Sequence, residues 1–146
     1  MEELRKLRNR LNKIDKDFEQ LALDSAMEHY DVIIDMNVED QLFQRGVDST
    51  GRLLPAYSPI TVEIKRAQGK PYDRTTLRDE GDFHSNFYVV KEGDGLRISS
   101  KDSKTTMLVR DYGEQIFGLT EENLEAFIND FLFTEIKKRI DEYINT

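Results

Sequence analysis

The chain is 146 residues long, carries a formal net charge of −8 at pH 7, and contains two histidines and no cysteine. The absence of cysteine excludes thiol nucleophiles, thiolate metal sites and disulfides, and the acidic balance argues against binding nucleic acid through charge alone. No apolar run approaches the roughly 18 residues of a membrane span, and the N-terminus is charged where a signal peptide would be apolar. We therefore expect one intracellular domain, residues 1–146, that does not contact a membrane.

Residues 1–45 carry two successive apolar stripes with helical spacing. The first stripe follows the three-and-four alternation of a coiled-coil heptad and consists of Leu4, Leu7, Leu11, Ile14, Phe18 and Leu21. The second begins at Met27, continues through Tyr30, Ile34, Val38 and Leu42, and stops at Gly46, a residue type suited to ending a helix. We expect two helical segments or one bent helix in this part of the chain.

Two interpretations of the stripe in residues 1–21 are open. In one, it forms a seam between two chains, because Glu3 with Arg8 and Arg10 with Asp15 would face each other across parallel helices. In the other, it packs on its own domain. We favour the second, because a small sheet needs helices to cover it and the sequence offers only two long candidates.

Residues 46–85 contain all three prolines and four of the eight glycines, which predicts a long ordered loop with a helix only near residues 58–67. Ordered loops of this length are usually functional or interfacial. We expect its apolar and aromatic side chains to anchor a partner while two arginines fix the orientation. The candidate interface residues are Leu53, Leu54, Tyr57, Tyr72, Arg74 and Arg78.

Residues 45–78 hold seven basic and three acidic side chains, so this segment is locally basic within an acidic protein. Charge clusters of this kind are usually solvated loops. The alternative is contact with DNA or with an acidic partner, which would also make assembly sensitive to salt.

The stretch TTLRDEGDFHSNF, residues 75–87, has the composition of either an active site or a structural turn. Asp79, Asp82 and His84 could hold a metal ion for hydrolysis, but no HExxH pattern, nucleophile motif or phosphate-binding loop accompanies them. We therefore expect no enzyme, no catalytic residue, no cofactor and no metal site, and we keep a metal-dependent hydrolase as the least favoured alternative.

As a structural turn, the same stretch has a simple physical basis. Gly81 can adopt a positive φ at little cost, so the chain can turn sharply there. Leu77 and Phe83 would anchor the turn from either side.

The pattern of residues 86–146 predicts strands followed by a helix. The segments NFYVVK and LRISS flank EGDG, a strong turn signal, and TTMLVRDY reads as a third antiparallel strand. The final helix should begin after Thr120, a residue type suited to the N-cap and followed here by two glutamates. The predicted fold class is α+β, with a long helical N-terminal part, a long ordered loop, a small sheet of about three strands and a C-terminal helix.

Four short motifs follow one another in a characteristic order. They are Gly46, Asp48 and Gly51; then Pro55, Ser58 and Thr61; then Leu77, Gly81 and Phe83; then Phe117, Gly118, Leu119 and Thr120. In this order the chain resembles the Mu-type phage virion-morphogenesis family, also called tail completion proteins, or a related head–tail neck protein. The resemblance covers about 75 residues.

The resemblance implies a non-enzymatic phage or prophage structural protein that acts in tail completion or head–tail joining through self-assembly. It further implies other neck or tail proteins as partners, a homo-oligomer that could form a ring, and a location in the bacterial host cytoplasm during assembly and then in the virion. A small regulatory protein-binding module is the alternative.

Overall fold

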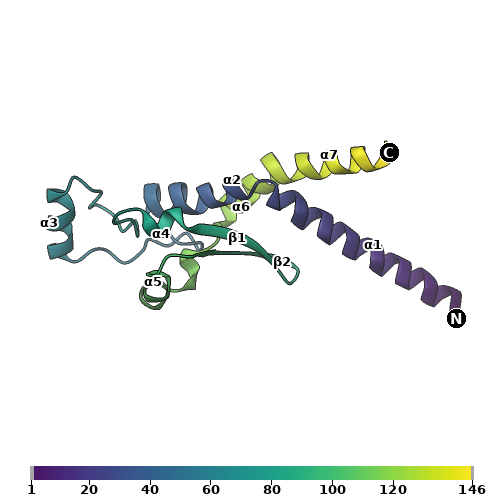
Figure 1. Cartoon of the computed structure of the whole chain (residues 1–146), viewed down its shortest axis with the longest axis horizontal. Helices are drawn as coiled ribbons and strands as arrows, with labels where there is room; N and C mark the ends of the chain where they lie inside the picture. The colour runs from purple at the N-terminus through teal and green to yellow at the C-terminus, as the bar shows by residue number, and fades with distance from the viewer. Residues whose placement is uncertain (1, 146) are drawn as a thin grey trace.

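The N-terminal third is helical, as its two apolar stripes predict. In the computed structural model, which describes residues 2–145, α1 spans Glu2–Met27 and α2 spans Tyr30–Asp35 (Figure 1). Helix α2 continues into a π-helical stretch, η1, over Met36–Arg45. Gly46 follows in the left-handed conformation at φ 64°, which glycine adopts without steric cost. The predicted end of the helix at Gly46 is confirmed.

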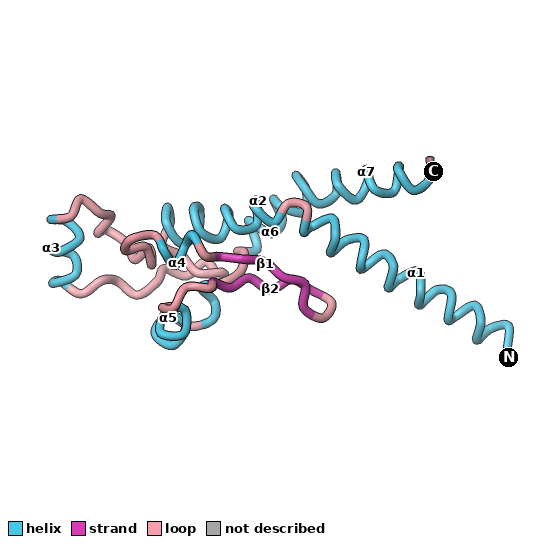
Figure 2. The backbone as a smooth tube through the Cα atoms, in the orientation of Figure 1, coloured by secondary structure: helices cyan, strands magenta, loops and turns pink. Residues whose placement is uncertain are grey.

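Residues 47–81 form an arm that extends away from the sheet and returns to it (Figure 2). Most of the arm is loop, and α3, Pro59–Ala67, lies at its far end. The Ser58 hydroxyl caps α3 by accepting a hydrogen bond from the Thr61 N–H at 3.2 Å. The predicted long loop with one helix near residues 58–67 is confirmed.

The arm is closed by hydrogen bonds between its two ends, in a region around Gly46, Leu54, Pro55 and Thr75 that we call the arm base. The Leu54 N–H donates to the Gly46 carbonyl at 2.8 Å, and the Thr75 hydroxyl donates to the Pro55 carbonyl at 2.5 Å. A Cβ atom on Gly46 would lie 2.9 Å from the Thr75 carbonyl oxygen, closer than packing allows. The two ends of the arm therefore meet at a position that only glycine fits.

The sheet has two antiparallel strands. A short helix, α4 (Asp82–Ser85), leads into β1 (Phe87–Glu92), and β2 (Gly95–Ser100) returns beside it with Val89 opposite Ile98 (Figure 1). Val89 is buried against the α1 and α2 side of the molecule, so the helical N-terminal part covers this face of the sheet.

The predicted third strand is wrong, because residues 105–112 form a helix. Helix α5 spans Thr105–Tyr112, and a turn precedes it in which the Asp102 carboxylate accepts a hydrogen bond from the Lys104 N–H at 3.0 Å. The β-branched residues of this segment suggested a strand, but its apolar side chains pack on the core with helical spacing. They are Leu108, Val109 and Tyr112.

The C-terminal part is helical from residue 114 onward, apart from one extended segment. It comprises η2 (Glu114–Ile116), α6 (Glu121–Phe127), η3 (Ile128–Leu132) and α7 (Phe133–Ile144). The predicted N-cap is confirmed, since the Thr120 hydroxyl accepts the N–H of the residue three positions later at 3.1 Å. None of the helices in residues 2–145 combines the length and apolar character needed to cross a bilayer.

Two clusters of buried side chains make up the core. The larger joins η1, the arm base, the 77–87 turn and η2, and consists of Val38, Leu42, Leu54, Leu77, Phe83, Phe87 and Ile116. The smaller joins α1, α2, β1 and α6, and consists of Ala26, Ile33, Val89 and Phe127. Both clusters lie in the middle of the molecule, while α1 and α7 project at one end and α3 at the other (Figure 1).

The stretch around Gly81 is a structural turn, as one of the two interpretations predicted. Gly81 has φ 94°, and Leu77 and Phe83 on either side of it are both buried in the larger core cluster. Leu77 itself has φ 57°, a conformation that costs a leucine about 1–2 kcal/mol. Burial of its side chain offsets this strain. Nothing in the sequence indicates that Leu77 adopts a positive φ.

Two buried amide side chains on η1 hold the extended segment before α6. Asn37 donates to the Ile116 carbonyl at 3.0 Å and accepts from the Gly118 N–H at 2.8 Å. Gln41, one turn later, donates to the Gly118 carbonyl at 2.8 Å and accepts from the Thr120 N–H at 2.9 Å. These four bonds pair the backbone of residues 116–120 as a neighbouring β-strand would, in a place where no strand is available.

Replacing Asn37 with alanine should lower the free energy of unfolding by about 2 kcal/mol or more, because a buried carbonyl and a buried N–H lose their partners. Asn9→Ala, on an exposed face of α1, is the matched control and should change stability by less than about 0.5 kcal/mol. Urea unfolding of the two variants beside the wild type makes the comparison. Equal midpoints for both variants would show that the hydrogen bonds of Asn37 to residues 116–120 contribute nothing to stability.

Candidate interaction surfaces

The apolar stripe of α1 is exposed, so the favoured interpretation that it packs on its own domain is wrong. Leu4 is 67% exposed, and each of the next four members of the stripe is more than half exposed. The sheet does not need α1 as a cover, because it has two strands and the α2 side of the molecule already covers one face. Only the end of α1, around Ser25 and Ala26, is buried.

Helix α7 adds further apolar surface at the same end of the molecule (Figure 1). Arg139 of α7 contacts Glu28 at 3.0 Å, and this ion pair ties α7 to the end of α1. Beyond that point the two helices diverge, and α7 exposes Phe133, Ile140, Tyr143 and Ile144.

The arm carries a second exposed apolar surface. Leu53 is 73% exposed and Tyr72 is 43% exposed, as the predicted interface requires. Sequence reasoning missed Ile60 and Ile64, which are exposed on α3. Their spacing of four residues after a Ser-Pro helix start could have revealed them as one face of a helix.

One of the predicted interface residues is buried in this structure, and a second is only partly exposed. Leu54 is only 6% exposed and belongs to the core, so its assignment to the interface is wrong. Tyr57 is half-buried, and its hydroxyl accepts the Thr76 N–H at 3.0 Å. Adjacent residues in an extended chain point to opposite sides, which explains why Leu53 is exposed and Leu54 is buried.

The two predicted orienting arginines act within the chain. The Arg78 guanidinium lies 3.9 Å from the centre of the Phe43 ring and pairs with Glu39 at 2.7 Å. Arg74 donates to the Phe43 carbonyl at 2.7 Å and pairs with Asp73. Both side chains thus bind the arm to η1 through cation–π and hydrogen-bond contacts, and their role in orienting a partner stays a prediction.

Ion pairs balance much of the positive charge in residues 45–78. Arg66 pairs with Glu63 at 3.8 Å, and Lys70 pairs with Asp79 at 2.8 Å. Lys65 is buried beneath its own segment and donates to the Arg78 carbonyl. Contact between this segment and DNA stays a prediction.

The acidic cluster does not assemble into a metal site. Asp79 is held by Lys70, whose hydrogen bond and charge lower the pKa of that carboxyl. His84 is 5% exposed, and its Nδ1 accepts a hydrogen bond from Arg78 Nε at 3.1 Å, which occupies the lone pair that a metal would need. Within residues 2–145 no three His, Cys, Asp or Glu side chains are grouped so as to hold a metal ion.

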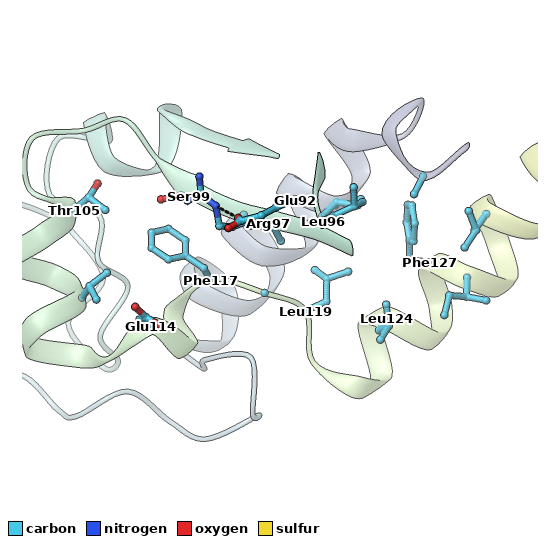
Figure 3. Close-up of a pocket in the computed structure, with 17 residues that line it drawn as sticks. Glu92, Leu96, Arg97, Ser99, Thr105, Glu114, Phe117, Leu119, Leu124 and Phe127 are labelled. Carbon is cyan, nitrogen blue, oxygen red and sulfur yellow. Dashed lines mark ion pairs between the residues drawn. The ribbon is translucent and has the colours of Figure 1, made fainter. Parts of the chain in front are cut away.

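An open groove of about 810 Å³ lies along β2 (Figure 3). Leu96 and Ile98 of β2 form one wall, and the segment containing Phe117 and Leu119 forms the other. An ion pair between Glu92 and Arg97 lies at its margin. Helix α6 contributes Leu124 and Phe127. No sequence signal indicated this groove.

Comparison with known proteins finds no matching family model, no similar curated protein and no similar solved structure. The resemblance to the tail completion family thus rests on the four ordered motifs alone. It remains a prediction.

The buried His84 should make the protein less stable in mild acid. Burial and the positive charge of Arg78 lower the pKa of His84 from 6.5 to about 4. As the pH falls through this interval, the unfolded chain binds a proton that the folded chain does not. The free energy of unfolding should therefore decrease from about pH 6.5 to pH 4, by about 3 kcal/mol in total from this group.

Urea unfolding at pH 7 and at pH 4.5 measures this loss. His84→Gln, which keeps a hydrogen-bond acceptor for Arg78, should flatten the dependence on pH. His29→Gln removes the only other histidine and should leave the dependence in place. A wild-type stability that stays constant over this interval would contradict the assignment of a neutral, buried imidazole.

Proposed function

We propose that this chain is a non-enzymatic structural protein of a phage or prophage virion, acting in tail completion or head–tail joining through self-assembly. The order of the four motifs supports the family. The proposal places the protein in the bacterial host cytoplasm during assembly and then in the virion.

The observation that carries the proposal is exposed apolar surface at both ends of an elongated molecule. The α1 and α7 surface lies at one end and the α3 surface at the other, separated by the folded body (Figure 1). Soluble monomers rarely expose large contiguous apolar patches, and such patches usually mark interaction sites. A subunit with separate exposed surfaces at its two ends can contact more than one neighbour, as assembly into a larger particle requires.

The proposed partners are other copies of the chain and neighbouring proteins of the neck or tail. A second candidate function, a small protein-binding module, is favoured by the groove along β2, which is large enough for a few side chains of a partner segment. The two functions differ in what they require. A binding module works as a monomer, whereas the structural protein works as part of a larger particle.

Deleting the gene in a host whose prophage can be induced should leave incomplete particles, seen by electron microscopy as heads without finished tails. Wild-type protein supplied in trans should restore complete particles. Leu11→Asp should fail to restore them, because a charge on the exposed stripe disrupts a partner contact, while Leu11 belongs to neither core cluster.

Asn9→Asp is the matched control for this experiment, since Asn9 lies on the same helix outside the apolar stripe. It should complement as well as the wild type. Complete, infectious particles from the deletion strain itself would overturn the proposed function.

A further inference from the structure

We propose that α1 pairs in parallel with α1 of a second copy of this chain and forms a two-stranded coiled coil over residues 4–18. This inference deepens the proposed function and rests on it, because it names the partner of one assembly surface.

The first step is that residues 2–20 of α1 are not covered by the rest of the chain. All residues from Glu2 to Gln20 are exposed, and the apolar stripe runs along this part of the helix. Most helical stability in proteins comes from packing an apolar face, and this part of α1 has no such packing within its own chain. A helix with a continuous, uncovered stripe therefore requires a partner surface of matching length.

The second step is the spacing of the stripe. In heptad positions, Leu4, Leu11 and Phe18 occupy the a positions, while Leu7 and Ile14 occupy the d positions. This narrow seam is what one helix of a coiled coil presents, whereas a helix lying on a sheet or in a broad groove shows a wider apolar face.

The third step is charge complementarity. Glu3 and Arg10 are at g positions, and Arg8 and Asp15 are at the e positions that face them from a parallel partner. A parallel dimer thus gains Glu3–Arg8 and Arg10–Asp15 pairs, each formed twice by symmetry. Among residues 2–145, no ion pair within the chain engages any of these four side chains, so all are available to a second copy.

The fourth step concerns direction. An antiparallel pair that used the whole stripe would place Leu4 opposite Leu21 of the partner, near the end of α1. That end is already covered, because Ala26 is buried and Asp24 pairs with Lys91 of β1. It would also bring Glu3 close to Asp24 of the partner, a like-charge contact. The parallel arrangement overlaps only the exposed residues.

Cysteine cross-linking tests the arrangement on the full chain, which has no cysteine of its own. In a parallel coiled coil, Leu4→Cys lies next to its own copy in the partner and should form a disulfide-linked dimer on mild oxidation, reversed by reductant. Asn9→Cys, on the outer face of the same helix, is the matched control and should cross-link several-fold less.

Two results would overturn the proposal. Equal cross-linking of Leu4→Cys and Asn9→Cys would indicate random collision. Cross-linking of Leu4→Cys only after mixing with Leu21→Cys would indicate an antiparallel pair.

Charge exchange gives a second, independent measurement. Arg10→Glu alone and Asp15→Lys alone should each weaken the dimer in sedimentation experiments, because each creates like-charge contacts. An equal mixture of the two variants should restore dimers. In a parallel pair of the two, the introduced glutamate faces the introduced lysine on one side of the seam, and the native Arg10–Asp15 contact remains on the other. A mixture that remains monomeric would overturn the parallel pairing.

These outcomes are separable from those of the proposed function. A monomeric chain whose deletion still leaves incomplete particles would overturn the coiled coil and leave the virion role standing. If the protein forms a cross-linked parallel dimer but particles are complete without its gene, the coiled coil stands and the virion role is overturned.

Discussion

The body of this protein depends on the backbone of residues 116–120 being held by two amide side chains. Asn37 and Gln41 lie one turn apart on η1, and both are fully buried. Together they satisfy the carbonyl and N–H groups of an extended segment that has no strand beside it. This clamp fixes where η2 ends and α6 begins, and therefore the position of Phe127 in the smaller core cluster. It also fixes one wall of the groove along β2.

Sequence periodicity and local capping predicted most of the helices, the hairpin and the turn at Gly81, because these depend on neighbouring residues. The buried amides could not be predicted, since asparagine and glutamine on a helix are normally solvent-facing and only their distant partners reveal them. The same limit explains the error over residues 105–112, where β-branched residues favoured a strand and packing of Leu108 and Tyr112 favoured a helix.

The candidate surfaces were predicted less well than the fold, and the reason is also physical. Leu53 and Tyr72 are exposed, but the adjacent Leu54 is in the core, and composition cannot separate neighbours that face opposite ways. Arg74 and Arg78 have the residue type of interface anchors, and here the same chemistry binds Phe43 of the same chain. The stripe of residues 4–21 does lie on a helix, as predicted, but the prediction that it packs on its own domain was wrong. The two-stranded sheet is already covered on one face by the α2 side of the molecule and does not need α1 as well.

The arm base has a consequence for how the spacing between the two ends of the molecule can change. Hydrogen bonds at Gly46, Leu54, Pro55 and Thr75 close the arm there, and neither core cluster takes a side chain from residues 56–73. Lengthening a loop that is already closed costs little, about 0.6 kcal/mol for each doubling of its length. Insertions or deletions between residues 56 and 73 would therefore alter the reach of α3. They would break the contacts that Tyr57, Lys65 and Lys70 make with residues 76–79, but would remove no side chain from either core cluster.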